Sequence, residues 1–136
     1  MAVALEIVSP EKLLMAADVG MVVVPATEGN LGVLPGHSPM IATLRGGVID
    51  IYADGKTISS RLFVAGGFAE ITGERCTVLA DEAVPVAELS RAAAEARVAA
   101  AEAAWTAADK MDIAAIDIAL DKLQAARAML DAAQAA

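Results

Sequence analysis

Glycine and proline divide this chain into two parts that must fold differently. All ten glycines of the 136-residue sequence lie before residue 74, and the last of its five prolines is Pro85. Glycine costs backbone entropy in a helix, and proline removes a hydrogen-bond donor from it. Residues 1–85 therefore suit short strands and turns, whereas nothing in residues 86–136 interrupts a helix. We expect two domains that meet at this boundary.

Residues 1–85 have the pattern of short strands joined by tight turns. The stretch VALEIVS has the alternation of a strand, with Val3, Leu5 and Ile7 on one side, and DVGMVVVPA is rich in β-branched residues. Asp54-Gly55 is a typical two-residue hairpin turn, and residues 72–74 predict a second hairpin. Short strands with regularly spaced turns indicate an all-β sandwich or barrel.

Residues 86–136 are rich in alanine, the residue with the highest helix propensity. From Ala87 onward, 22 of 50 residues are alanine. A single helix of this length would measure about 75 Å, too long beside a small sandwich. Asp109 or Asp112, in the stretch AADKMDI, is a suitable N-cap for a second helix. We therefore expect an antiparallel two-helix hairpin, with helices at about 87–107 and 112–133.

Each predicted helix has one apolar stripe, but the first consists mostly of alanine and the second of leucine and isoleucine. A buried leucine stabilises a fold by about 1.5–3 kcal/mol, and an alanine methyl by much less. We therefore expect the hairpin to be detachable or to be completed by a partner. The expected stripes are Leu89, Ala92, Ala96, Ala99 and Ala103 in the first helix, and Ile113, Ile116, Leu120, Leu123 and Leu130 in the second.

Charge and cysteine content exclude several classes of function. The formal net charge is -8, whereas nucleic-acid binding needs a basic surface and anionic lipid would be repelled. Cys76, the only cysteine, lies in the apolar stretch CTVLA and is expected to be buried. The N-terminus lacks the basic region of a signal peptide, and no apolar run is long enough to insert into a membrane. We expect a soluble cytoplasmic protein.

The residues needed for an active site or a metal site are nearly absent from the sequence. His37 is the only histidine, and it adjoins Ser38 without a GxSxG motif around it. No P-loop motif is present. Lys56 follows the Asp54-Gly55 turn, whereas cofactor carriers place their lysine at the centre of the turn. We therefore expect no catalytic or metal-binding residue, and keep a cofactor carrier or small enzyme as the remaining alternative class.

Four stretches carry a resemblance to a known family. They are EIVSPEKLL (6–14), VVVPATEGNLGVLPGHSPMIATLRGGVI (22–49), FVAGGFAEI (63–71) and TVLADEA (77–83). Over its whole length the chain resembles the epsilon subunit of bacterial proton-translocating ATP synthases. The most specific part is a loop at 28–39, which matches the family pattern EG-x-x-G-x-x-PGH-x-P at every fixed position.

This resemblance implies a ten-stranded β-sandwich and a two-helix hairpin. It also implies a non-catalytic rotor subunit of the central stalk that contacts the gamma subunit and the polar loops of the c-ring. Such a subunit lies peripherally at the cytoplasmic face of the bacterial inner membrane. The family places Ser9, Asn30 and His37 at the c-ring end, and several relatives have an acid in place of Asn30. For His37 we keep two alternatives: its side chain contacts the c-ring, or it forms hydrogen bonds only within its own loop. The stretch AGGF (65–68) is a candidate for the side that faces the gamma subunit.

The resemblance also implies two regulatory roles for the hairpin. In many members it reaches the alpha and beta subunits and inhibits ATP hydrolysis; in some it binds ATP. The ATP motif [IL]-D-x-x-R-A corresponds here to ELSRA, with Glu88 and Arg91, and Arg97 and Glu82 are further candidates. Residues 88–136 hold five basic and eight acidic side chains, so we expect only weak inhibition. An ATP-sensing module is the alternative function.

Overall fold

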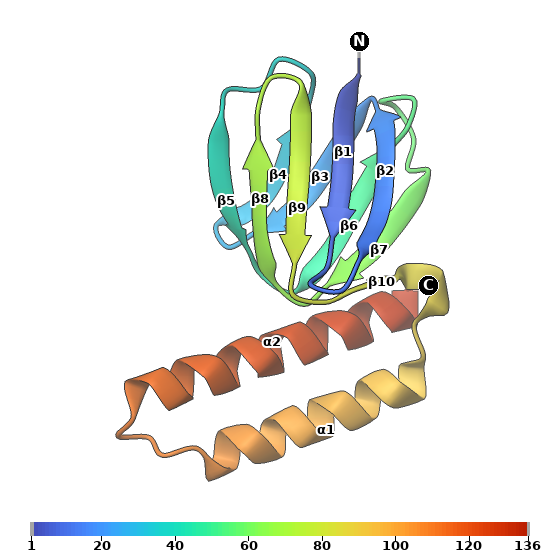
Figure 1. Ribbon diagram of the computed structural model, residues 1–136. Helices are drawn as coiled ribbons and strands as arrows, with labels where there is room; N and C mark the ends of the chain where they lie inside the picture. Colours follow the sequence, from blue (N-terminus) through green and yellow to red (C-terminus); the bar gives the residue numbers. More distant parts are fainter. Residues whose placement is uncertain (1, 136) are drawn as a thin grey trace.

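In the computed structural model, which describes residues 2–135, ten strands are followed by two long helices (Figure 1). The expected fold class, a β-sandwich with a C-terminal helical hairpin, is confirmed. The strands are β1 (Val3–Val8), β2 (Leu13–Val19), β3 (Met21–Ala26), β4 (Gly29–Val33), β5 (Met40–Leu44), β6 (Gly47–Tyr52), β7 (Ser60–Val64), β8 (Gly67–Ile71), β9 (Arg75–Ala80) and β10 (Ala83–Pro85). A 3₁₀ turn, η1 (Val86–Glu88), leads into α1 (Arg91–Ala107) and α2 (Ile113–Ala135).

The strands follow one continuous ladder that folds over into two layers. Their order is β10-β7-β6-β3-β5-β8-β9-β1-β2, and β4 pairs with β3 outside this path. β3 and β5 share only the pair Ala26–Leu44, and at this narrow joint the ladder turns from one layer into the other. β5, β8, β9, β1 and β2 form the front layer in Figure 1, and the remaining strands form the back layer.

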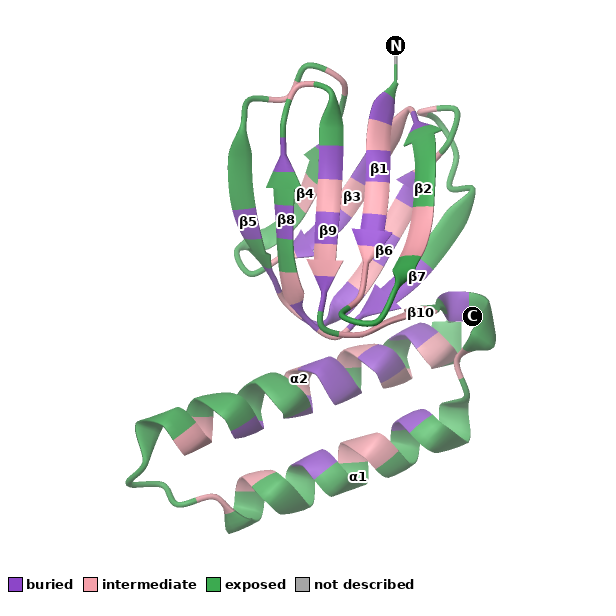
Figure 2. Cartoon of the chain, in the orientation of Figure 1, coloured by how far each residue is buried: buried purple, intermediate pink, exposed green. Residues whose placement is uncertain are grey.

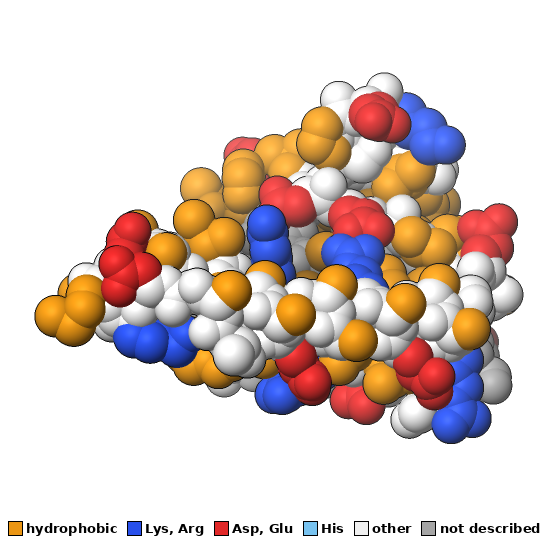
Figure 3. Space-filling view, turned by 90° about the horizontal axis from the view of Figure 1, so that it is seen from below, with side chains coloured by type: hydrophobic (Ala, Val, Ile, Leu, Met, Phe, Trp, Pro, Cys, Tyr) orange, Lys and Arg blue, Asp and Glu red, His pale blue; other side chains and the backbone are white. Residues whose placement is uncertain are grey.

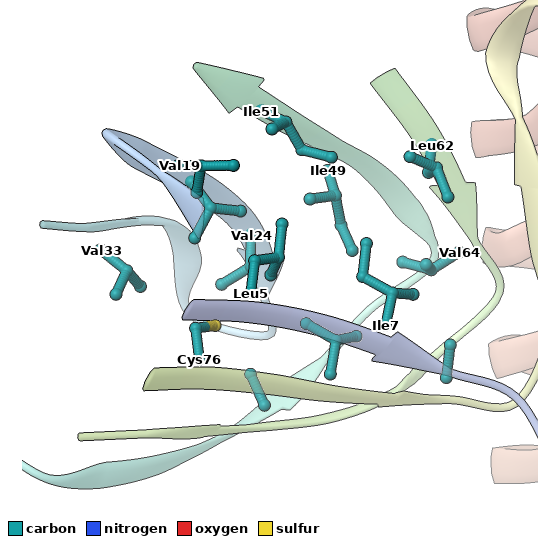
Figure 4. Close-up of a cluster of buried hydrophobic side chains, with 14 of the residues drawn as sticks. Leu5, Ile7, Val19, Val24, Val33, Ile49, Ile51, Leu62, Val64 and Cys76 are labelled. Carbon is teal, nitrogen blue, oxygen red and sulfur yellow. The ribbon is translucent and has the colours of Figure 1, made fainter. Parts of the chain in front are cut away.

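The space between the layers is filled with aliphatic side chains (Figure 4). Along β1 every second residue is buried, as expected for a strand with one face toward a core. Cys76 lies among these side chains with 0% exposure, so its predicted burial is confirmed. Burial in this apolar environment raises the pKa of the Cys76 thiol to about 11.

Of the two predicted hairpin turns, one is confirmed and the other is wrong. The turn at residues 72–74 joins β8 to β9 as expected, and the Thr72 hydroxyl accepts hydrogen bonds from the N–H groups of Glu74 and Arg75. Asp54-Gly55 is not a two-residue turn, because the connection between β6 and β7 extends from residue 53 to residue 59. The Asp54 carboxylate accepts hydrogen bonds from the next two N–H groups after Gly55, which stabilises this wider loop.

The first helix begins later than the sequence pattern predicts. Residues 86–88 form a 3₁₀ turn, and Ser90 then caps α1 by accepting a hydrogen bond at its hydroxyl from the N–H of Ala93. Asp112 caps α2 in the same way at the N–H of Ala115, while Asp109 accepts from the N–H of Met111 within the connection. Both predicted aspartates therefore accept hydrogen bonds from backbone N–H groups at the break between the helices.

The faces that the two helices bury differ from the predicted stripes. In α1 the alanines at 92, 96, 99 and 103 are exposed, and the buried residues are Ala94 and Ala101 (Figure 2). Val98 and Trp105 pack against Leu123 and its neighbours, so the two larger side chains set the orientation of α1. In α2 the expected stripe is buried at Leu123, half-buried at residues 116 and 130, and exposed at residues 113 and 120.

Candidate functional site

The three residues predicted at the c-ring end lie on different parts of the sandwich. Ser9 is in the turn between β1 and β2, where its N–H and its hydroxyl both donate to the carbonyl of Lys12. This turn lies at the end of the sandwich that faces the helices in Figure 1. Asn30 lies near the start of β4, opposite Pro25 of β3. The turn between β3 and β4 also lies toward the helices.

The segment EGNLGVLPGHSPM is not one loop, as the sequence suggested, because its first part is β4. A strand rises about 3.3 Å per residue, so five residues carry the chain most of the way along a small sandwich. Only residues 34–39 form a loop, and it lies at the end opposite the helices (Figure 1). There the N–H of Gly36 donates to the carbonyl of Gly73, and His37 Nδ1 lies 2.7 Å from the carbonyl oxygen of Ser38. The structure therefore separates His37 from Asn30.

The Asn30 side chain is part of a hydrogen-bonded connection to the helices. Arg45 donates from Nη2 to Asn30 Oδ1 at 2.7 Å and from Nε to the carbonyl of Ala26 at 3.2 Å. The next residue, Gly46, exchanges two hydrogen bonds with the side-chain amide of Gln124 in α2. The turn between β5 and β6 thus joins one end of the back layer to the hairpin.

The outer face of the front layer carries an apolar row across four strands. Cross-strand register places Phe68 beside Leu79, Leu79 beside Val8, and Val8 beside Leu13. Phe68 is 43% exposed and Leu13 is 56% exposed, while the two residues between them are half-buried. Ile41, 70% exposed, lies on the neighbouring β5. Exposed apolar side chains that gather on one face of a sheet often mark protein contact surfaces.

Of the four residues predicted for ATP, the structure brings two into contact. The Arg97 guanidinium donates to both oxygens of Glu82 at 2.9 and 2.6 Å. This pairing lowers the pKa of the Glu82 carboxyl and raises the pKa of Arg97. Arg91 instead pairs with Glu95 of its own helix at 3.1 Å, and Glu88 is exposed in the 3₁₀ turn.

A cavity of about 320 Å³ lies beside the Glu82–Arg97 pair, between the sandwich and the hairpin. Its charged lining consists of Asp81, Glu82, Arg97, Asp121 and Lys122, so acids outnumber bases. Glu88 and Arg91 are not among the residues that line it. Within residues 2–135, no three His, Cys, Asp or Glu side chains are placed to hold a metal ion. No helix in the same range is both long and apolar enough to cross a membrane.

Sequence reasoning missed the residues that attach the hairpin to the sandwich. Leu62, Phe63 and Val64 are all buried, because one face of β7 meets the core and the other meets the helices. Three consecutive apolar residues in a strand indicate burial on both faces, so the sequence LFV does indicate this second buried face. The hydrogen bonds between Gly46 and Gln124 could not be predicted from the sequence, because they form only when the hairpin docks on the sandwich.

The architecture first defines a class: a small β-sandwich with an apolar row on its outer face and a helical hairpin docked at one end. Residues 2–86 match the family described as ATP synthase, Delta/Epsilon chain, beta-sandwich domain. The chain belongs to this family. Its relatives are ATP synthase epsilon chains, which are accessory subunits of the ATP synthase complex.

Two relatives align with nearly the whole chain. The ATP synthase epsilon chain of Granulibacter bethesdensis is 62% identical over 130 residues, which cover 96% of each protein. That of Gluconacetobacter diazotrophicus is 46% identical over 133 residues, covering 98% of this chain and 94% of the relative. The hairpin as well as the sandwich is therefore shared with these epsilon chains.

Solved ATP synthase structures contain chains with the same fold. One, from Euglena gracilis mitochondrial ATP synthase (OSCP/F1/c-ring, rotational state 1), has a TM-score of 0.76 at 21% identity, covering 96% of this chain and 81% of that one. Another, from the central stalk/c-ring of Tetrahymena thermophila mitochondrial ATP synthase, has a TM-score of 0.66 at 14% identity, with coverages of 98% and 97%. At these identities the likeness is one of fold.

Proposed function

We propose that this chain is a rotor subunit of the central stalk that joins the c-ring to the gamma subunit and transmits rotation during proton-driven ATP synthesis. It carries no active site of its own in this role. Family membership supports the proposal, as do the fold neighbours from a central stalk/c-ring and an F1/c-ring assembly. The observation that carries it furthest is the exposed apolar row on the front layer, which suits a permanent protein partner.

The gamma subunit is the partner proposed for this row. Phe68, from the stretch AGGF, lies in the row together with Leu79 and Val8. Burying such side chains against a partner gains about 25 cal/mol per Å² of apolar surface. A closely packed aliphatic core lies beneath the row and makes this surface stiff, and transmission of torque requires a stiff contact surface.

A pull-down of purified gamma with this chain tests the proposal. Phe68→Glu should weaken capture at least about tenfold, because a charge would be buried in an apolar contact. Ile58→Glu is the matched control, since Ile58 is 46% exposed but lies in the loop between β6 and β7. Capture that both variants retain fully would rule out the row as the gamma surface, and absence of capture by the unaltered chain would contradict the rotor role.

The c-ring polar loops are the second proposed partner, with Ser9, Asn30 and His37 as candidate contacts. Through this attachment the chain would lie peripherally at the cytoplasmic face of the bacterial inner membrane. Because the three residues do not share one end of the sandwich, they cannot all form a single compact footprint. The proposal therefore divides into two contact regions that can be tested separately.

The hairpin is proposed to have a weak regulatory role toward the alpha and beta subunits. Its side chains from residue 88 onward carry three more acids than bases, so long-range attraction to an acidic surface would be weak or repulsive. Removal of the residues after Asp81 should leave ATP hydrolysis by the reconstituted complex nearly unchanged. A several-fold rise in hydrolysis would show instead that the hairpin is a strong inhibitor.

ATP binding through Glu82, Glu88, Arg91 and Arg97 stays a prediction. For both arginines to reach the phosphates, Arg97 would have to leave Glu82 and Arg91 would have to leave Glu95. Isothermal titration with ATP, with Arg91→Ala as the comparison, tests this alternative. Binding that is lost in the variant would support a sensor, whereas no heat of binding in the unaltered chain would remove it.

A further inference from the structure

We propose that the chain binds a single-chain amphiphile with a carboxylate head group, such as a fatty acid, in an open seam of the sandwich between β2 and β7. The seam is an apolar groove with Leu14 and Met15 on one side and residues 58–62 and 85–87 on the other. This inference concerns a small ligand and goes beyond the proposed role in the stalk.

The seam exists because the strand ladder does not close into a barrel. β2 pairs only with β1, and β10 pairs only with β7, so β2 and β10 are the two ends of the ladder. β10 covers β7 only from Leu62 to Val64, which leaves the start of β7 at a free edge. β2 and β7 lie at the same side of the sandwich (Figure 1), and the groove runs between them.

The groove is lined mainly by apolar side chains. Leu62 and Val86 are 8% and 6% exposed, and Leu14 and Met15 pack against the sandwich core. Leu62 also belongs to that core (Figure 4), so the groove opens directly onto it. The volume of about 740 Å³ lies within the usual range of small-molecule sites, about 300–1,000 Å³. An apolar chain in this groove would lose its contact with water and cover the exposed part of the core.

Arg61 is the only charged residue that lines the groove. Its Nε donates to Asp50 Oδ1 at 2.8 Å, and no acceptor within residues 2–135 is bonded to its two Nη groups. Because 42% of the side chain is exposed, these groups can donate to a ligand. Asp50 offsets part of the charge, so hydrogen bonding selects the head group more than long-range attraction does. A carboxylate fits best, since it accepts two parallel hydrogen bonds from a guanidinium.

Four other cavities in the described part of the chain are less suited to an anion. Two between the sandwich and the hairpin carry more acids than bases, and the one between β4 and β5 has Glu28 as its charged residue. A fourth, along α2, balances two arginines with two aspartates. Figure 3 shows acidic and basic groups interspersed on the hairpin side of the molecule. In a chain with a net charge of -8, the seam is the cavity among these five whose charge complements a carboxylate.

Isothermal titration of the full-length chain with decanoate tests the proposal, with 1-decanol as the uncharged comparison. Decanoate should bind saturably, and decanol at least about tenfold more weakly, because only the carboxylate accepts charge-assisted hydrogen bonds from Arg61. Amide shifts in NMR spectra should map the decanoate site to residues 58–62 and 85–87. Absence of saturable binding, equal affinity for the two ligands, or shifts confined to other parts of the chain would overturn the proposal.

Charge variants separate the head-group contact from general electrostatics. Arg61→Gln should weaken decanoate binding at least about tenfold and leave decanol binding nearly unchanged. Arg75→Gln removes the same charge at an exposed position in β9 and should change little. Asp50→Asn breaks the same ion pair but keeps Arg61, so it should retain or strengthen decanoate binding. Equal weakening by Arg61→Gln and Arg75→Gln, or by Arg61→Gln and Asp50→Asn, would contradict a contact at Arg61.

Ile58→Glu tests the apolar part of the groove. An acid in the lining should abolish decanoate binding, because the ligand tail would have to remove water from the new charge. Phe68→Glu, in the apolar row, should weaken the capture of gamma but leave decanoate binding unchanged. The two variants therefore distinguish failure of this proposal from failure of the proposed role in the stalk. Decanoate binding that is unaffected by Ile58→Glu would rule out the seam.

Discussion

At the scale of single residues, glycine permits a close backbone contact between Gly20 and Gly55 in the sandwich. A Cβ added to Gly20 would lie 2.5 Å from the nitrogen of Gly55 and 2.7 Å from its Cα. Both atoms belong to backbone, which cannot rotate away as a side chain can. Gly20→Ala should therefore lower the free energy of unfolding by about 1–3 kcal/mol, measured by urea denaturation.

Gly32→Ala is the matched control for this substitution, because Gly32, in β4 of the sandwich, has open space around its Cβ position. Its free energy of unfolding should stay within about 0.5 kcal/mol of the original, or rise through the reduced entropy of the unfolded chain. Equal losses in the two variants would mean that the packing of Gly20 on Gly55 is not the cause.

Single-residue predictions succeeded where the neighbours along the chain determine the environment. Cys76 lies in an alternating strand, so its burial follows from the pattern, and Asp112, one of the two aspartates predicted as caps, caps α2. Asp54-Gly55 failed as a tight turn because the loop is shaped by contact with Gly20, far away in sequence. The role of Phe63 likewise depends on a helix that docks on it.

At the scale of elements, the strands could be predicted more fully than the buried faces of the helices. Strand alternation offers only two faces, and one of them is clearly apolar. In α1 alanine occupies every face, so spacing alone does not tell which side is buried. In the structure the partly buried Val98 and Trp105 pack against the cluster that contains Leu123 of α2, and they mark the buried side of α1.

The ion pair between the elements predicts a pH dependence of hairpin docking. Hydrogen bonds from Arg97 lower the pKa of Glu82 in the docked state, so docking is favoured when Glu82 is ionised. This contribution is fully present above the ordinary glutamate pKa of about 4.3 and is lost as pH falls through the lowered value. Amide hydrogen exchange in the helices, corrected for its intrinsic pH dependence, should therefore indicate weaker docking as the pH falls below the ordinary glutamate pKa.

Other groups around the cavity also titrate or carry charge, namely Asp81, Asp121 and Lys122. The comparison with Glu82→Gln isolates the pair, since this variant keeps those neighbours but cannot ionise at position 82. Its docking should be weaker at neutral pH and should change less on acidification. An identical pH profile in the two proteins would exclude Glu82 as the group responsible.

At the scale of the whole molecule, the family pattern at residues 28–39 identified the protein class but misjudged the geometry. Asn30 and His37 belong to one motif, yet β4 carries the chain from one end of the sandwich to the other between them. Motif spacing gives no direction in space, and only the pairing of β4 with β3 reveals the separation. We therefore expect the two residues to meet different surroundings in an assembled complex.

Cysteine cross-linking in the assembled ATP synthase tests this separation. Asn30→Cys and His37→Cys would each be paired with a cysteine placed in the polar loop of the c subunit. Cys76 should contribute little background, because it is fully buried and its thiol pKa is raised to about 11. We expect only one of the two positions to cross-link to the c subunit under mild oxidation, since one compact footprint cannot cover both ends of the sandwich. Efficient cross-linking from both positions would show that the ring contacts the side of the sandwich along β4, and cross-linking from neither would place the c-ring contact elsewhere on the chain.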